Sequence, residues 1–243
     1  MSKLQNYNGH FCESEYEYAF LAFLEAEGWQ YLSGKSISRA SQREVLYADD
    51  MEQFPSTTNP DLTVEEVRQI MDTVRLVGSE SDFATLHKVY GWMVNGIQFT
   101  LQDGSSRMIP LIDFDSPDKN ILRVVNQLVV EYTNNGQKEN RRPDVLLYVN
   151  GMPLCVIELK NPADAKATIY DAWEQINIRY WRDIPHLLHY CPMACISDGV
   201  KTRLGTVRTP YEHFYAWRRV NDGDEVSTLP FAETETILYY SKQ

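Results

Sequence analysis

The sequence predicts an α/β protein in which helices flank a central mixed β-sheet. Amphipathic helical patterns fill most of the N-terminal part, and short apolar runs rich in branched residues dominate the chain after about residue 95. Hydrophobic residues make up 43% of the 243 residues, an ordinary share for a globular chain of this size. We therefore expect residues 1–243 to form a single domain, with a helical part over about 1–95 and a core over about 96–220.

Three helices are expected in the N-terminal part, each marked by a polar residue at its start. They cover Glu15–Glu27 with Ser14 as N-cap, Thr63–Val77 with a capping box at Thr63, and Ser81–Trp92.

Strands are expected wherever apolar runs lie between turn signals, such as Asp103-Gly104 and Asn150-Gly151. They cover Ile97–Leu101, Met108–Ile112, Ile121–Tyr132, Asp144–Val149, Leu154–Lys160 and Met193–Ser197. The polar segment Asn134–Arg142 is interpreted as a flexible loop. An apolar stripe predicts a helix over about Ala165–Trp181, between the last two strands.

Charged residues in two of these apolar strands form the most informative pattern of the chain. Pro143-Asp144 is followed after thirteen residues by Glu158-Leu159-Lys160. Charges in a buried sheet are costly unless they are paired, hydrogen-bonded or bound to metal. A divalent cation would turn the repulsion between the two carboxylates into binding, and a nearby lysine would stabilise anionic charge on a phosphate or an attacking water. This spacing is typical of metal-dependent phosphodiesterases.

The parity of the hairpin adds a condition. A regular two-residue turn at Asn150-Gly151 would pair Asp144 with Ile157 and point Glu158 to the opposite face. A shared site therefore requires an odd-membered loop or a one-residue bulge near the turn, and Gly151 suits a left-handed bulge position.

A simpler interpretation is also open. Glu158 and Lys160 could form an ion pair on an exposed strand, with Asp144 an ordinary residue at a strand edge, because such spacings occur by chance. The apolar run before Glu158 argues against an exposed strand.

Four segments together resemble the N-terminal endonuclease domain of the restriction (R) subunit of type I restriction–modification enzymes, a branch of the PD-(D/E)xK nuclease superfamily. The segments are Glu13–Trp29, Leu111–Glu131, Arg141–Pro162 (RRPDVLLYVNGMPLCVIELKNP) and Ile196–Arg218. The resemblance implies a PD-(D/E)xK restriction-endonuclease-like fold. It also implies a Mg²⁺-dependent DNA endonuclease, a type I site-specific deoxyribonuclease, without sequence readout of its own.

The resemblance assigns roles to the motif residues. Asp144 and Glu158 would be metal ligands, the carbonyl of Leu159 a third ligand, and Lys160 would position the attacking water and stabilise the transition state. An acidic residue of the first helix would complete the metal site. Glu15 is the closer match, and Glu17 remains open.

The helix after the motif carries two further candidates, Gln175 and Tyr180. The family has a Gln-x₃-Tyr element at this place, and this chain has one residue more between the two. Residues five apart do not share a line on a regular helix. Either a local bulge restores the alignment, or one residue is not equivalent, in which case Arg179 could take the line and Tyr180 could be a core aromatic.

The net charge of −11 argues against tight DNA binding. Local basic positions do exist: Lys138, Arg141, Arg142, Arg179, Arg182, Arg203, Arg208, Arg218 and Arg219. In the resemblance, DNA is gripped by an ATP-driven helicase-like motor and by modification and specificity subunits. The motor is absent from this chain, so we expect a recombinant domain or a truncated product. ATP would then be used only by the motor domains that this chain does not contain.

Two other functional classes are kept as alternatives. The chain could be a catalytically idle nuclease-fold docking module within a DNA-processing complex, or an acidic interaction domain unrelated to nucleic acid. No apolar run is long enough for a membrane helix and no signal-peptide core is present, so a cytoplasmic location is expected. The four cysteines have no framework spacing and are expected to be reduced and mostly buried.

Overall fold

The computed structural model describes residues 13–78, 81–161 and 167–216. Its helices are α1 (Glu13–Ala26), α2 (Ala48–Thr58), α3 (Val64–Arg75), α4 (Asp82–Asn95), α5 (Ile169–Glu174), the π-helix η2 (Gln175–Tyr180), α6 (Trp181–Asp183) and α7 (Pro185–Leu188), with 3₁₀ turns η1 (Pro117–Lys119) and η3 (Tyr211–His213). Its strands are β1 (Gln30–Ser33), β2 (Ile97–Thr100), β3 (Ser106–Ile109), β4 (Leu122–Asn126), β5 (Val130–Asn134), β6 (Gln137–Arg141), β7 (Val145–Val149), β8 (Met152–Leu159), β9 (Met193–Ser197) and β10 (Thr202–Thr206).

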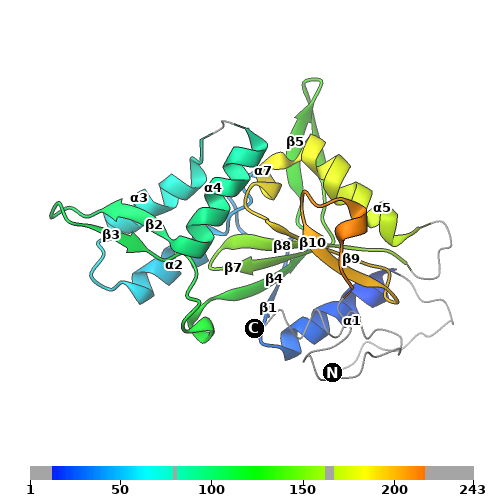
Figure 1. Ribbon diagram of the computed structural model, residues 1–243, viewed down its shortest axis with the longest axis horizontal. Coiled ribbons are helices and arrows are strands. Elements are labelled where there is room, and N and C mark those ends of the chain that lie inside the picture. The colour runs from blue at the N-terminus through cyan, green and yellow to red at the C-terminus, as the bar shows by residue number, and fades with distance from the viewer. Residues whose placement is uncertain (1–12, 79–80, 162–166, 217–243) are drawn as a thin grey trace.

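A six-stranded mixed sheet forms the centre of the molecule, in the order β1-β4-β7-β8-β9-β10 (Figure 1). The pairs β1/β4 and β8/β9 are parallel and the other three are antiparallel. Every residue of β7 and all but one of β8 are buried, as expected for strands covered on both faces. The predicted class, a mixed α/β fold with helices flanking the sheet, is confirmed.

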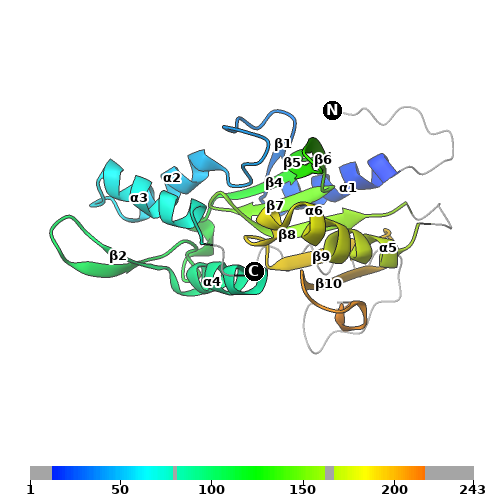
Figure 2. The ribbon, with the colours of Figure 1, turned by 90° about the horizontal axis from the view of Figure 1, so that it is seen from above.

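Helices α1 and α5 cover opposite faces of this sheet (Figure 2). On the α1 side, Phe20 and Leu24 belong to the same buried cluster as the β8 residue Ile157. On the α5 side, Ile176 and the neighbouring β8 residue Val156 belong to the other cluster. Because side chains alternate along a strand, β8 contributes residues to the buried clusters on both faces of the sheet. By the same alternation, the side chains of residues 144 and 158 are on the α5 face of the sheet.

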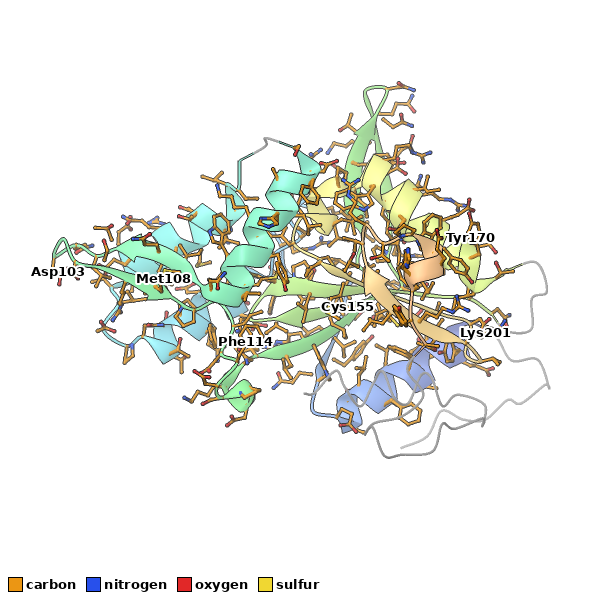
Figure 3. The ribbon with its side chains drawn as sticks, in the orientation of Figure 1. Asp103, Met108, Phe114, Cys155, Tyr170 and Lys201 are labelled. Carbon is orange, nitrogen blue, oxygen red and sulfur yellow. The ribbon has the colours of Figure 1, made fainter. Side chains whose placement is uncertain are left out.

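The helices α2–α4 and the β2–β3 hairpin lie at the end of the molecule away from α1 and α5 (Figure 1). Asp103 marks the tip of this hairpin in Figure 3. The capping box predicted at Thr63 is present. The second oxygen of its Glu66 carboxylate accepts a hydrogen bond from the backbone N–H of Gln102, at 2.9 Å. This buried carboxylate thereby ties α3 to the hairpin.

Two predictions around β4–β6 are wrong. The single strand expected over Ile121–Tyr132 is divided into β4 and β5 because Gln127 adopts a left-handed conformation with φ of 51°. The expected flexible loop Asn134–Arg142 contains β6 instead. The β5–β6 hairpin turns at Asn135-Gly136, both with positive φ, and it projects from the body of the molecule (Figure 1).

Other boundaries also differ from the expectation. Helix α1 begins at Glu13, so Ser14 lies within it. The helix expected from Ala165 starts at Ile169 with a capping box at Thr168, and Ala165 itself lies outside the described residues. Strands β1 and β10 and helices α2 and α7 were not expected.

Three cysteines, Cys155, Cys191 and Cys195, are free and buried, as predicted. Cys12, Arg218 and Arg219 lie outside the described residues. In the part of the chain that the structure describes, no helix has the length and apolar character needed to cross a membrane.

Candidate active site

A one-residue bulge in β8 places the two motif carboxylates on one face. Val149 pairs with Met152 across a regular two-residue turn, but Leu147 pairs with Cys155, so one extra residue, Leu154, lies between these pairs. Extending the register beyond the pair Val145–Ile157 brings Asp144 opposite Glu158. The irregularity demanded by parity is therefore present, in the strand just after the turn and not in the turn itself.

Both carboxylates are buried and each is held by hydrogen bonds. Asp144 Oδ2 accepts from the backbone N–H of Leu159 at 2.9 Å, and Oδ1 accepts from Gln127 Nε2 at 3.2 Å. The Glu158 side chain is completely buried. An ordinary exposed ion pair, the simpler interpretation of the sequence pattern, does not describe this arrangement.

Burial raises the pKa of Glu158 well above its usual range, and the negative charge of Asp144 raises it further. A hydrogen bond between the two carboxyl groups acts in the same direction, because it requires a proton. The Tyr180 hydroxyl and the Lys160 ammonium oppose the shift. The site thus concentrates negative charge that only a proton or a cation can relieve.

The π-helix η2 brings Gln175 and Tyr180 onto the same carboxylate. Gln175 Nε2 donates to Glu158 Oε2 at 2.5 Å, and the Tyr180 hydroxyl donates to Oε1 at 2.6 Å. Gln175 Nε2 also lies 2.9 Å from the Tyr180 hydroxyl oxygen. A π-helix advances one residue more per turn than an α-helix, so residues five apart share a line. The extra residue is absorbed by a local bulge, one of the two outcomes considered, and Arg179 is exposed.

Lys160 extends from the end of β8 toward the same group. Its Nζ donates to Gln175 Oε1 at 3.1 Å, and its backbone N–H donates to the Ser197 carbonyl at 2.8 Å. Gln175 therefore links the lysine to Glu158 through its two amide ends. Lys160 and Glu158 approach one site without forming the direct ion pair of the alternative interpretation.

Glu17, and not Glu15, is the first-helix residue that reaches this site. Glu17 accepts from Asn126 Nδ2 at 2.6 Å and from Gln127 Nε2 at 2.8 Å, while Glu15 is exposed. Two residues of a helix differ by about 200° in direction, so only one of them can face the sheet. These hydrogen bonds favour Glu17 over Glu15 as the residue that would complete a metal site, and that role stays a prediction.

Burial raises the pKa of Glu17, and the charge of Asp144 adds to the effect. Gln127 is the residue that sequence reasoning missed, since its amide joins Glu17 to Asp144. The only local signal is its left-handed backbone, which a glutamine does not announce in the sequence.

The donor set fits a hard divalent cation. Mg²⁺ commonly binds through one or two carboxylates and completes its shell with water and substrate phosphate. Asp144 and Glu158 each retain lone pairs beyond the hydrogen bonds described here. Among the described residues, no group of three or more His, Cys, Asp and Glu side chains could hold a metal ion. The fit therefore rests on two carboxylates.

Residues 11–213 match the family model described as "Type I restriction enzyme R protein N terminus". The chain belongs to this family. The chain is 28% identical over 236 residues to a putative type I restriction enzyme MjaIXP endonuclease subunit of Methanocaldococcus jannaschii. It is 29% identical over 241 residues to the type I restriction enzyme HindI endonuclease subunit of Haemophilus influenzae.

Each of these alignments covers 93% of the chain and 22% of the relative. A third relative, the type I restriction enzyme EcoprrI endonuclease subunit of Escherichia coli, is 29% identical over 195 residues, which cover 79% of the chain and 57% of that relative. The R protein N terminus thus spans about a fifth of the length of the first two relatives.

Proposed function

We propose that this domain is a Mg²⁺-dependent DNA endonuclease with a PD-(D/E)xK-type centre. The carrying observation is the convergence of Asp144, Glu158 and Lys160 on one face of a buried hairpin, brought about by a bulge. Bulges next to functional groups often re-aim a side chain. The relatives, named as type I restriction endonuclease subunits, support the same reaction class.

Asp144 and Glu158 would hold the metal ion, and the carbonyl of Leu159 would be a third ligand. The ion would supply charge stabilisation on the phosphate and lower the pKa of a bound water. Metal binding requires Glu158 in its charged form, so uptake should release a proton and strengthen as the pH rises.

Lys160 would position the attacking water and stabilise charge that develops on the phosphate. Gln175 fixes the ammonium beside Glu158, which keeps the lysine at the metal and phosphate side of the site. Gln175 and Tyr180 are thus positioning residues for the two charged groups. Glu17 would be the acidic residue of the first helix that the resemblance assigns to the metal site.

DNA would be the substrate, with modification and specificity subunits as partners of the longer R protein and ATP used only by its motor. Basic side chains gather near the centre despite the net charge of −11. Arg142 attracts the Glu17 carboxylate, and Lys160 and Arg179 attract the Asp171 carboxylate. These residues would partly screen the acidic surface where a phosphate approaches.

The test is Lys160→Ala in the full-length R subunit assembled with its partners. We expect DNA cleavage to fall by about 10²–10³, the typical loss when one transition-state charge stabiliser is removed. ATP hydrolysis and assembly should be unchanged. Lys160→Arg should not rescue cleavage, since a planar guanidinium does not replace a compact ammonium beside a metal.

A docking module makes the opposite forecast. Under that function Lys160→Ala leaves the assembled complex cleaving DNA, or it impairs assembly instead. Cleavage at a near-normal rate by a folded Lys160→Ala enzyme would show that the nuclease centre lies elsewhere.

A further inference from the structure

A polar cavity of about 670 Å³ lies at the base of the β5–β6 hairpin, where the hairpin meets α6 and α7. Its lining includes three arginines, Arg43, Arg141 and Arg182, and two carboxylates, Glu139 and Asp183. We call the three arginines the arginine cluster. A surplus of guanidinium groups in one cavity of a chain with a net charge of −11 indicates a site for an anion.

Asp183 organises two of these arginines. Arg141 Nε lies 2.6 Å from Asp183 Oδ2, and Arg182 Nε lies 2.7 Å from Oδ1. The Asp183 side chain is 6% exposed, and the hydrogen bond from Arg182 is the main cause that lowers its pKa, so it stays ionised. One carboxylate thus holds two guanidinium groups, and each keeps N–H donors for a further partner.

The remaining lining groups leave a surplus of one positive charge, because Glu139 stays ionised and the other lining residues are neutral or arginine. The Glu139 carboxylate is engaged by the Tyr132 hydroxyl at 2.6 Å and by Asn134 Nδ2 at 2.8 Å. Burial lowers the pKa of His186 to about 4, so this lining residue is neutral at neutral pH. Arg43 is exposed, and the structure gives its guanidinium no ion pair within the described residues.

The cavity lies close along the chain to the candidate active site. Asp183 follows Tyr180, which binds Glu158, by three residues of continuous helical structure, a rise of about 4.5 Å. Arg141 precedes Asp144 by three residues, which span at most about 10 Å along the chain. A nucleic-acid strand advances about 3.4 Å per nucleotide, so the cluster lies within a few nucleotides of the carboxylates.

From this arrangement we infer that the arginine cluster is a phosphate clamp for the DNA backbone beside the cleaved bond. The inference rests on the proposed function and names residues for the grip on its substrate. Arginine forks suit the paired oxygens of a phosphodiester, and a carboxylate that fixes them in advance reduces the ordering cost of binding. The projecting β5–β6 hairpin borders the cavity, so a DNA strand lying in the cavity would run along the hairpin (Figure 1).

The test is binding of a fluorescein-labelled DNA duplex to the 243-residue chain, measured by anisotropy over a range of salt concentrations without divalent cations. Arg43→Ala/Arg182→Ala removes two cluster residues and spares Arg141, which also anchors the hairpin. We expect about tenfold weaker binding at low salt and a salt slope smaller by about two, one for each lost phosphate contact.

The matched control is Arg68→Ala/Lys88→Ala, which removes two exposed positive charges from α3 and α4. It should change binding only slightly. A second variant, Arg43→Lys/Arg182→Lys, keeps the charge and should retain most of the salt slope, which protects the conclusion if the alanine variant unfolds.

Equal losses in the cluster variant and the control would overturn the clamp. So would calorimetric binding of inorganic phosphate that the cluster variant loses while its DNA binding stays normal, because the cavity would then be a small-anion site. No cleavage occurs in this assay, so its failure leaves the nuclease proposal intact. Cleavage by Lys160→Ala tests that proposal separately.

Discussion

At the residue scale, Glu158 is a destabilising group that the site retains. Its raised pKa means that the folded state binds this proton more tightly than the unfolded state does. Stability from this group is therefore complete below the unfolded pKa of about 4.3 and is lost as the pH rises through the folded pKa. A buried carboxylate that weakens the fold at neutral pH indicates a role in binding or catalysis.

Glu158→Gln should accordingly stabilise the metal-free chain at neutral pH. The neutral amide fills nearly the same space and does not repel Asp144. We expect the free energy of unfolding to rise at neutral pH, and the gain to vanish at acid pH, where Glu158 is protonated in both states. Urea unfolding of both proteins across pH measures it. A pH-independent loss of stability in Glu158→Gln would contradict the charge argument.

Tyr180→Phe tests the positioning role at this carboxylate. The variant removes the 2.6 Å hydrogen bond that favours the charged form of Glu158, so the pKa of Glu158 should rise further. We expect a stability loss of about 1–2 kcal/mol for a buried hydrogen bond, and the acidic limb of the pH–rate profile for cleavage should move to higher pH. A profile that falls in rate without moving would indicate a merely structural tyrosine.

At the element scale, the bulge in β8 and the π-helix η2 perform the same task by different means. Each accommodates one residue beyond the regular repeat and thereby aligns a side chain with Glu158. Parity made an irregularity in the hairpin predictable, because Asp144 and Glu158 could share a face in no other way. Its place, at Leu154, was not predictable, since any residue between the turn and the motif satisfies parity.

The other residues of the site could be predicted from the sequence to different degrees. The spacing of Gln175 and Tyr180 left two outcomes, and only the backbone could decide between them. The link through Gln127 was hidden because its break between β4 and β5 involves no glycine, proline or aspartate. Long-range contacts override local propensity at such positions, and a single sequence does not display them.

Deletion of Ile178 should convert η2 into regular α-helix without loss of the site. Ile178 is 50% exposed within η2, and its removal leaves Gln175 and Tyr180 on one line of an α-helix, four residues apart. We expect the stability of the variant to lie within about 1 kcal/mol of the parent, because a π-helical turn is exchanged for a regular α-helical one.

The matched control is deletion of Lys88, an exposed residue of the regular helix α4. That deletion rotates every later residue of the helix by about 100° and exposes its buried face, so it should be strongly destabilising. Thermal unfolding distinguishes the two. Comparable destabilisation by both deletions would contradict the prediction, because it would show that the fold requires the π-helical form of η2.

At the scale of the whole molecule, charge and function oppose each other. A net charge of −11 repels DNA, whereas the arginine cluster and Lys160 offer a local positive edge beside the buried carboxylates. Salt screens the distant charges over about 10 Å at 0.1 M, so the two effects act over different ranges. Under the proposed function, the chain by itself would position a DNA strand that partner subunits hold.

The isolated chain should bind duplex DNA weakly and with a steep salt dependence. If about three arginines contact phosphates, the logarithm of affinity should fall with the logarithm of salt at a slope of about −3. Glu65→Gln/Asp72→Asn on α3, where neither residue lines the cavity, should strengthen binding at low salt only, because it relieves long-range repulsion without adding a contact. Anisotropy titrations over the same salt series measure both quantities. Tight binding that persists at physiological salt would mean that base or apolar contacts, and not a few phosphate contacts, hold the DNA.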